Sequence, residues 1–279
     1  MNYIKRAKMK SFSVRMLVYA AAGATVAALI FIVAYILIKG VPNLSWDLFS
    51  LEYNSDNVSL MPALINTVTV TLCSLILAVP LGVFSAIYLV EYARRGNRLV
   101  KIVRITAETL TGIPSIVYGL FGYLLFVSAL GWGLSLLAGV FTLSIMILPV
   151  IIRTTEEALK SVPDSFREGS FGLGAGKLRT VFKLVLPSAV PGILAGVVLS
   201  VGRIVGETAA LIYTAGTFAQ IPKTLLGSGR TLSVHMYNLW SEGMNSEQSY
   251  ATAVILLITV IFLNALSSFI AKKITKGKS

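Results

Sequence analysis

The chain has 279 residues, of which 56% are hydrophobic and 13% are charged, and its formal net charge is +12. Several charge-poor runs are long enough to cross a hydrocarbon core of roughly 30 Å, which excludes an ordinary soluble globular protein. A strongly basic chain can also bind nucleic acid, so the positions of the cations decide between that interpretation and a membrane protein.

Six apolar runs predict six transmembrane helices. A backbone in lipid must satisfy its own hydrogen bonds, so the predicted fold class is an all-α integral membrane protein with its helices packed as one bundle. We expect a single transmembrane domain over 16–271, between a cytoplasmic N-terminus over 1–15 and a cytoplasmic tail over 272–279. The six predicted spans are 16–38, 64–90, 105–130, 134–152, 189–213 and 251–271.

The cations cluster on one side of this topology. The N-terminus, the loops after the second and fourth spans, and the C-terminal tail hold 20 of the 24 lysines and arginines. The opposite side keeps Lys39, Lys223 and Arg230, and Arg203 lies within a span. The positive-inside rule therefore places both termini in the cytoplasm, and we expect no nucleic-acid partner. The long outer segment over 214–250 is expected to fold on or into the outer mouth.

The cytoplasmic loop over 153–188 carries the signals of a short capped helix. Ser161 suits an N-cap, Pro163 suits the first turn, and Asp164 is the carboxylate of a capping box. Gly174 supplies a left-handed stop. One face of this knob is apolar and the rest forms a charged rim with Asp164, Arg167 and Glu168. The apolar face comprises Val162, Phe166, Gly169 or Ser170, and Leu173.

Beyond this stop, a second apolar stripe is expected to lie along the inner membrane surface. It consists of Leu178, Val181, Phe182 and Val185. A connector without any partner is the alternative interpretation of the loop.

Two opposite charges lie inside the predicted fifth span. Arg203 and Glu207 are four residues apart, so a continuous helix would put them on one face. They could neutralise each other, or line a translocation route together with Thr208, since a guanidinium suits an oxyanion. Glu207 can accept a hydrogen bond from an anion that still carries a proton, as phosphate does near pH 7 and sulfate does not. Glu108, close to Arg104, is expected to reach the inner interface or to cap the helix, and not to line a pathway.

The sequence predicts no nucleotide or metal site in this chain. The stretch 172–177 looks like a phosphate-binding loop, but Leu178 replaces the required Ser or Thr and no strand precedes it. The single histidine, His235, falls in a predicted outer loop, so a metal site is not expected. Cys73 is the one cysteine and falls inside the second span, which excludes an intramolecular disulfide.

Four motifs resemble known permeases. Glu168-Gly169-Ser170, then Gly174, then the Leu-Val-Leu-Pro of 184–187 resemble the EAA-type loop of ABC importer permeases, although Gly169 and Ser170 stand where that family usually has alanines. The other three motifs are similar to the PstA family of phosphate permease subunits. They are Ile-Pro-Ser-Ile-Val-Tyr-Gly over 113–119, Arg203 with Gly-Glu-Thr-Ala-Ala-Leu over 206–211, and Val-His-Met-Tyr-Asn-Leu over 234–239.

This resemblance implies a type I ABC importer (MetI-like) permease fold, a transport subunit and not an enzyme. It implies a bacterial or archaeal inner membrane, a homologous permease subunit as heterodimer partner, two ATPase subunits that bind the ATP and Mg, and an extracytoplasmic phosphate-binding protein. No cofactor is expected on this chain. Arg203, Glu207 and Thr208 would line the pathway. The residues implied in ATPase coupling are Val162, Asp164, Phe166, Arg167, Glu168, Gly169, Ser170, Leu173 and Gly174.

Alternatives remain at this point. A permease of the same architecture could carry another oxyanion, such as molybdate, sulfate or phosphonate. A membrane-embedded lipid-modifying enzyme would need clustered catalytic side chains at the interface, and the chain has one histidine and no paired carboxylates within a span. A passive channel would leave the capped loop without a task.

Overall fold

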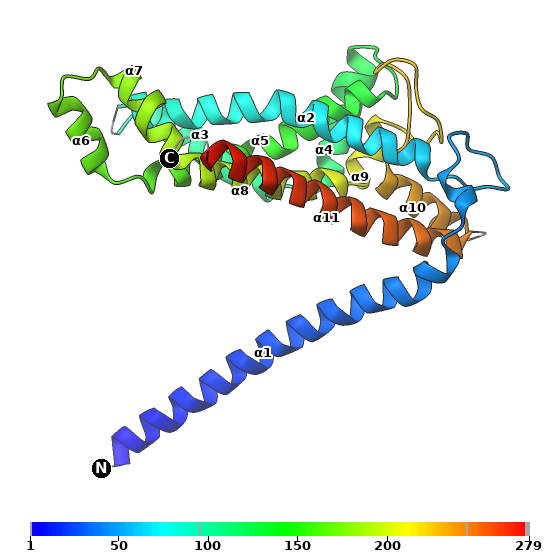
Figure 1. Cartoon of the computed structure of the whole chain (residues 1–279), viewed down its shortest axis with the longest axis horizontal. Helices are drawn as coiled ribbons and strands as arrows, with labels where there is room; N and C mark the ends of the chain where they lie inside the picture. The colour runs from blue at the N-terminus through cyan, green and yellow to red at the C-terminus, as the bar shows by residue number, and fades with distance from the viewer. Residues whose placement is uncertain (1, 95, 244, 277–279) are drawn as a thin grey trace.

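The computed structural model describes residues 2–94, 96–243 and 245–276, and these form helices and loops without a strand (Figure 1). Five helices are long and apolar enough to cross a membrane, and a bent pair of helices brings the number of spans to six. The predicted count of six is therefore confirmed, although two of the spans differ in shape from the prediction.

The chain begins with α1 (Asn2–Gly40) and reaches α2 (Met61–Ile87) through a loop with two short 3₁₀ turns. A π-helical turn, Tyr88–Tyr92, extends α2. The remaining elements are α3 (Arg98–Thr111), α4 (Ser115–Gly122) with its π-helical extension Tyr123–Ala129, α5 (Leu136–Lys160), α6 (Asp164–Gly172), α7 (Lys177–Thr180), the π-helical turn Val181–Val185, α8 (Leu186–Val205), α9 (Ala209–Thr214), α10 (Leu232–Glu242) and α11 (Ser246–Lys276).

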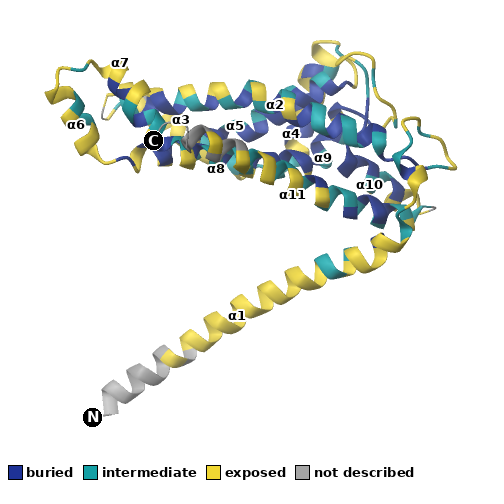
Figure 2. Ribbon diagram, viewed as in Figure 1, coloured by how far each residue is buried: buried dark blue, intermediate teal, exposed yellow. Residues whose placement is uncertain are grey.

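Helix α5 is the centre of the bundle and is the most deeply buried of the long helices (Figure 2). Small residues let its neighbours approach closely, as is usual between membrane helices. A Cβ added to Gly82 of α2 would lie 2.6 Å from Ile151 Cγ2, and one added to Gly196 of α8 would lie 2.0 Å from Thr154 Oγ1. Both glycines are therefore required by the contact of α2 and α8 with α5.

Helix α1 leaves the bundle at its C-terminal end and extends away from the other helices (Figure 1). Its apolar window is not buried against the rest of the chain. The C-terminal end of α1 contacts α11. There the rings of Tyr35 and Tyr250 meet edge to face, with centroids 5.9 Å apart, and Gly40 lies against the Tyr250 backbone. Most of the apolar surface of α1 is thus free to contact lipid or another protein.

The predicted third span over 105–130 is wrong as a single helix. Helices α3 and α4 meet at an angle of 106°. Pro114 cannot donate a backbone hydrogen bond and disfavours a helical conformation in the residue before it, so the helix stops at Thr111 and restarts at Ser115. The Tyr118 hydroxyl then donates to the Leu110 carbonyl at 2.8 Å and fastens the two halves together across the break.

The predicted fifth span over 189–213 also differs from the structure at both ends. A continuous helix runs from Lys177 to Val205. The apolar stripe over 178–185, expected to lie along the membrane surface, is therefore the N-terminal part of this span. Val181 and Val185 of the stripe are buried in the bundle. After Val205 the helix breaks, and the short helix α9 forms a separate element.

Candidate transport site and coupling element

The two helix breaks lie close together. Helix α4, which follows the first break, packs against α9, which follows the second. A Cβ on Gly119 of α4 would lie 2.8 Å from the Ala210 Cα of α9, so only glycine allows this approach. The motifs over 113–119 and 206–211 therefore form one structural unit.

Arg203 and Glu207 do not form the helical pair that their spacing predicts. Arg203 lies in the last turn of α8, where a cation interacts favourably with the helix dipole. Glu207 follows the end of that helix, because α8 stops at Val205 and Gly206 caps it. The structure gives no ion pair between the two side chains. Mutual neutralisation, the alternative considered for this pair, is therefore not what the geometry shows.

Glu207 has a structural task of its own. Its side chain is 8% exposed, and its Oε1 accepts a hydrogen bond from the Ala210 backbone N–H at 3.1 Å, which caps the start of α9. Its backbone carbonyl accepts a hydrogen bond from Ser233 Oγ at 2.5 Å, which ties the break to α10. Among the described residues, the second carboxylate oxygen has no hydrogen-bond partner.

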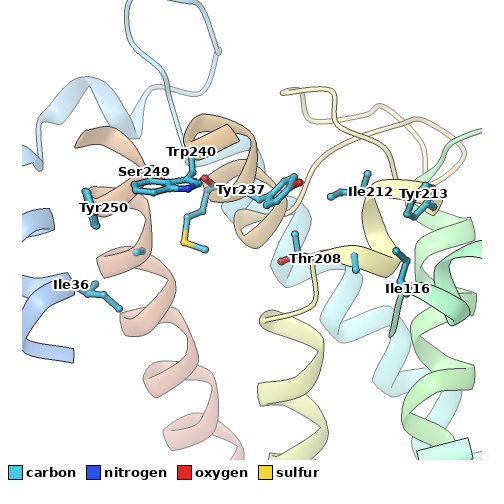
Figure 3. Close-up of a pocket in the computed structure, with 12 residues that line it drawn as sticks. Ile36, Ile116, Thr208, Ile212, Tyr213, Tyr237, Trp240, Ser249 and Tyr250 are labelled. Atoms are coloured by element: carbon cyan, nitrogen blue, oxygen red, sulfur yellow. The ribbon is translucent and has the colours of Figure 1, made fainter. Parts of the chain in front are cut away.

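Thr208 opens onto a cavity of about 680 Å³ between α1, α4, α9, α10 and α11 (Figure 3). The cavity is mainly apolar, and hydroxyl groups of Thr208, Tyr213 and Tyr237 are found among its lining. Arg203 and Glu207 are not part of this lining. Of the three residues predicted for the pathway, the cavity therefore includes only Thr208.

The predicted knob is present as α6, which projects from the end of the bundle together with α7 (Figure 1). The N-cap prediction is wrong: Ser161 caps the C-terminus of α5, its hydroxyl donates to the Ala158 carbonyl at 2.8 Å, and Pro163 precedes α6. The predicted stop is confirmed. Gly174 has φ +79°, and the Gly174 N–H donates to the Phe171 carbonyl at 2.9 Å.

The residues predicted for the knob's apolar face separate into two groups. Val162 is 5% exposed and packs in the bundle core ahead of α6, so it cannot contribute to an external surface. Phe166 and Leu173 are 45% and 90% exposed. Together with Gly169 and Ser170 they line a shallow hollow beside α7. The part of the predicted face that is open to a partner therefore starts at Phe166.

The charges of the knob are also divided. Asp164 and Glu168 are exposed, whereas Arg167 is largely buried and points inward. Its Nη2 lies 2.7 Å from Glu91 Oε1, and its guanidinium also donates to the backbone carbonyls of Val162 and Leu159. Arg167 thus fastens α6 to the end of α2 and is not part of an external rim.

The sequence did not reveal Glu91 as a partner because 76 residues separate it from Arg167. A second missed carboxylate is Glu156 of α5, which is 7% exposed. It pairs with Arg104 at 2.7 Å and with Lys160 at 2.5 Å. Arg104 therefore bridges α3 to α5. It lines one pocket together with Glu108, but the two side chains form no ion pair. Both missed carboxylates tie helices together at the α6 end.

The family described as "Binding-protein-dependent transport system inner membrane component" matches residues 78–278. The chain belongs to this family. Membership makes it a multi-pass inner membrane permease component of an ABC importer, a transport subunit that works with an ATPase and a substrate-binding protein. The matched region holds both helix breaks and the α6 knob.

Two curated relatives cover most of the chain. It is 32% identical over 271 residues to a "Probable ABC transporter permease protein YqgI" of Bacillus subtilis, covering 89% of this chain and 92% of the relative. It is 35% identical over 254 residues to the "Phosphate transport system permease protein PstA" of Yersinia pestis, covering 88% and 84%. Each alignment therefore covers more than two thirds of both chains.

Solved importer structures share the fold. A bacterial alginate ABC transporter chain matches with a TM-score of 0.69 at 18% identity, covering 96% of this chain and 98% of the other. A chain of the MetNI methionine ABC transporter matches with a TM-score of 0.58 at 21% identity, covering 87% and 98%. The predicted MetI-like permease fold is therefore confirmed.

Proposed function

We propose that this chain is the permease subunit of an ATP-driven importer for inorganic phosphate and forms half of its translocation pathway. The observation that carries the proposal is Arg203. Its guanidinium lies at a helix break and has no ion-pair partner among the described residues. The fork of N–H donors on a guanidinium suits the oxygens of phosphate. Relatives named as phosphate permeases support this choice of oxyanion.

Glu207 and Thr208 complete the proposed substrate contact. Because Glu207 Oε1 is engaged by Ala210, its other oxygen is the acceptor for the proton of monohydrogen phosphate. Sulfate carries no such proton at neutral pH, so the Glu207 carboxylate would repel it. Thr208 offers a hydroxyl at the edge of the adjoining cavity.

The proposed coupling element is the surface of α6. It docks in a groove of an ATPase subunit through the exposed side chains of Phe166, Glu168 and Leu173, while Arg167 holds the helix in place. The remaining proposed coupling residues are Asp164, Gly169, Ser170 and Gly174, with Val162 in a supporting place beneath them. ATP can drive alternating access only if α6 binds the two nucleotide states of the ATPase differently.

The proposed assembly has a homologous permease subunit as heterodimer partner, two ATPase subunits, and an extracytoplasmic phosphate-binding protein. ATP and Mg are bound by the ATPases, and this chain carries no cofactor. Both termini lie in the cytoplasm. In support, α11 runs back to the end of the bundle that carries α6, and α1 points away from the opposite end, where it joins the bundle (Figure 1).

Uptake of labelled phosphate by proteoliposomes containing the full complex tests the proposal. We expect uptake that requires ATP and the binding protein and that excess sulfate, molybdate or phosphonate does not reduce. Uptake of one of those anions in place of phosphate would assign a different oxyanion. Uptake by this chain alone, without an ATPase, would identify a passive channel and refute the coupling role of α6.

A further inference from the structure

Two nitrogen-bearing side chains are buried where the outer segment enters α10. Arg230 is 5% exposed and His235 is fully buried. Both contact the ring of Tyr53, which belongs to the loop between α1 and α2. Two segments that are distant in sequence therefore meet around one polar cluster, and neither proposed role of this chain uses it.

Arg230 presents one edge of its guanidinium without a protein acceptor. Its carbon Cζ lies 4.7 Å from the centroid of the Tyr53 ring, so the ring covers one face of the group. Its Nε and Nη2 are buried and make no hydrogen bond, and no carboxylate pairs with it among the described residues. These two nitrogens form the side-on edge that donates two parallel hydrogen bonds to an oxyanion.

His235 lies at the edge of the same Tyr53 ring, with the two ring centroids 6.1 Å apart and the planes perpendicular. Its two ring nitrogens are buried and neither meets the distance and angle limits of a hydrogen bond, although the Val58 backbone lies close enough to the ring to oppose the lowering of its pKa. Burial, followed by the positive charge of Arg230, lowers the pKa of His235 to about 3. The ring is therefore neutral at physiological pH and carries one N–H, and it contacts the same Tyr53 ring as Arg230.

The backbone around Arg230 is fixed by the bundle. Its N–H donates to the Phe218 carbonyl at 2.8 Å, and its carbonyl accepts from Asn66 Nδ2 of α2 at 3.1 Å. Val58 is buried beside the cluster with φ +44°, a conformation that a β-branched residue rarely adopts. The segments that carry the donors are thus held in place without any ligand.

We propose that Arg230 and His235 form a buried binding site for a small inorganic oxyanion at the end of the bundle opposite α6. The side-on edge of Arg230 supplies two donors and the neutral ring of His235 supplies a third. The site lies outside the residues proposed for translocation, and its existence does not depend on which solute is transported. Ser233, between the two residues, links it to the Glu207 carbonyl and so to the α8 break.

His235 is the only histidine of the chain and is therefore a specific probe. We would label histidine with ¹³C in the full chain, purified in phospholipid-free detergent with a tag that contains no histidine. Inorganic phosphate is then titrated at pH 7, with chloride at matched ionic strength as the control titration. We expect one histidine resonance that shifts saturably with phosphate and does not shift with chloride.

Four variants assign the shift. Arg230→Lys keeps the charge but lacks the two-donor edge, and it should weaken phosphate binding at least about tenfold. Lys223→Gln changes an exposed cation of the same segment and should bind as the wild type does. Arg203→Gln should also leave the shift unchanged, which separates this site from the transport site. If Arg230→Lys does not fold, His235→Asn replaces it. Binding of labelled phosphate is then measured by equilibrium dialysis on the Arg203→Gln background, where His235→Asn should bind less phosphate.

The proposal is overturned if the histidine resonance of the folded wild-type chain does not shift with phosphate, since bound water would then be enough to accept the hydrogen bonds of these donors. It is also overturned if Arg230→Lys binds phosphate as tightly as the wild type, or if the resonance responds only to phosphatidylglycerol vesicles. A complex that imports phosphate without the histidine shift would refute this site alone. A histidine shift without phosphate import would refute only the proposed function.

Discussion

The two ends of this bundle differ in how the charged side chains within it are partnered. At the α6 end, Glu91 pairs with Arg167 and Glu156 pairs with Arg104 and Lys160. At the α8 break and beyond it, Arg203 makes no ion pair with any residue that the structure describes, and Arg230 leaves two buried nitrogens without an acceptor there. The ion pairs at the α6 end join helices, whereas the unpaired cations at the other end are available to an anion.

This difference separates charged residues that hold the helices together from those that are available to contact substrate. Removing one partner of a buried pair strands the other charge and loosens the helices that it joined. Removing an unpaired cation leaves no opposite charge stranded in the protein, so its main effect is on what an anion meets. Substitutions at the α6 end should therefore act through stability and assembly, and those at the break should act through transport.

Arg203→Gln should have the largest effect, at least about a 30-fold loss of phosphate uptake, if the guanidinium contributes 2 kcal/mol or more to the bound anion. Proteoliposome uptake measures it, and co-purification with the ATPase checks that the complex assembles. Arg98→Gln, at an exposed arginine at the start of α3, is the control. Normal uptake by an assembled Arg203→Gln complex would remove Arg203 from the route.

Glu91→Gln should lower the free energy of unfolding of the α6 region by about 1.5–3 kcal/mol, because Arg167 is 15% exposed and would keep only Asp164, whose side chain is 79% exposed, as a charge partner. We expect less ATPase to co-purify and a lower thermal transition for the complex. Phosphate uptake per assembled complex should stay near the wild-type value. A stable complex with full ATPase content would show that Arg167 does not hold α6.

Gly174→Asp should cost about 1–2 kcal/mol, because residue 174 has φ +79° and a side chain there strains the backbone. The strain opens the stop of α6 and should reduce ATPase co-purification. Gly174→Asn is the matched control, since asparagine tolerates this conformation better. Equal losses from Asp and Asn would point to steric exclusion at the docking surface in place of backbone strain.

Glu168→Lys should weaken ATPase association without changing the stability of the permease, because Glu168 is exposed and makes no ion pair among the described residues. A surface contact of this type is worth about 1 kcal/mol or less, so the loss should be partial and larger at low salt. Retention of the ATPase at wild-type stoichiometry at every salt concentration would exclude Glu168 from the docking surface.

The number of spans and the stop at Gly174 could be predicted from sequence, because hydropathy over about twenty residues and the demand of a left-handed turn are local signals. The two helix breaks could not be placed. A hydropathy window of about twenty residues averages over Pro114 and over Gly206, so both spans read as continuous. The error over Arg203 and Glu207 followed directly, since their predicted face assumed an unbroken helix.

The ion pairs and the buried polar cluster could not be predicted from a single sequence, for a different reason. Glu91 meets Arg167 only because α2 and the loop before α6 end at the same place in three dimensions. His235 falls in a mixed segment that carries no span signal, yet it is fully buried because that segment folds back onto α2 and α11. Long-range contacts of this kind leave no periodic pattern in the chain.

The smallest effect is expected for Glu157→Gln, the exposed counterpart of Glu91→Gln at the same end of the bundle. Glu157 pairs with Arg153 at 3.1 Å, but the two side chains are 64% and 58% exposed. Such an i,i+4 pair is worth about 0.3–0.5 kcal/mol. Because Glu157 lies near the C-terminus of α5, losing its negative charge also relieves an unfavourable interaction with the helix dipole. Thermal unfolding and ATPase content should therefore match the wild type. If Glu157→Gln lowered thermal stability and ATPase content as much as Glu91→Gln does, burial would not explain why the ion pairs at this end stabilise the structure.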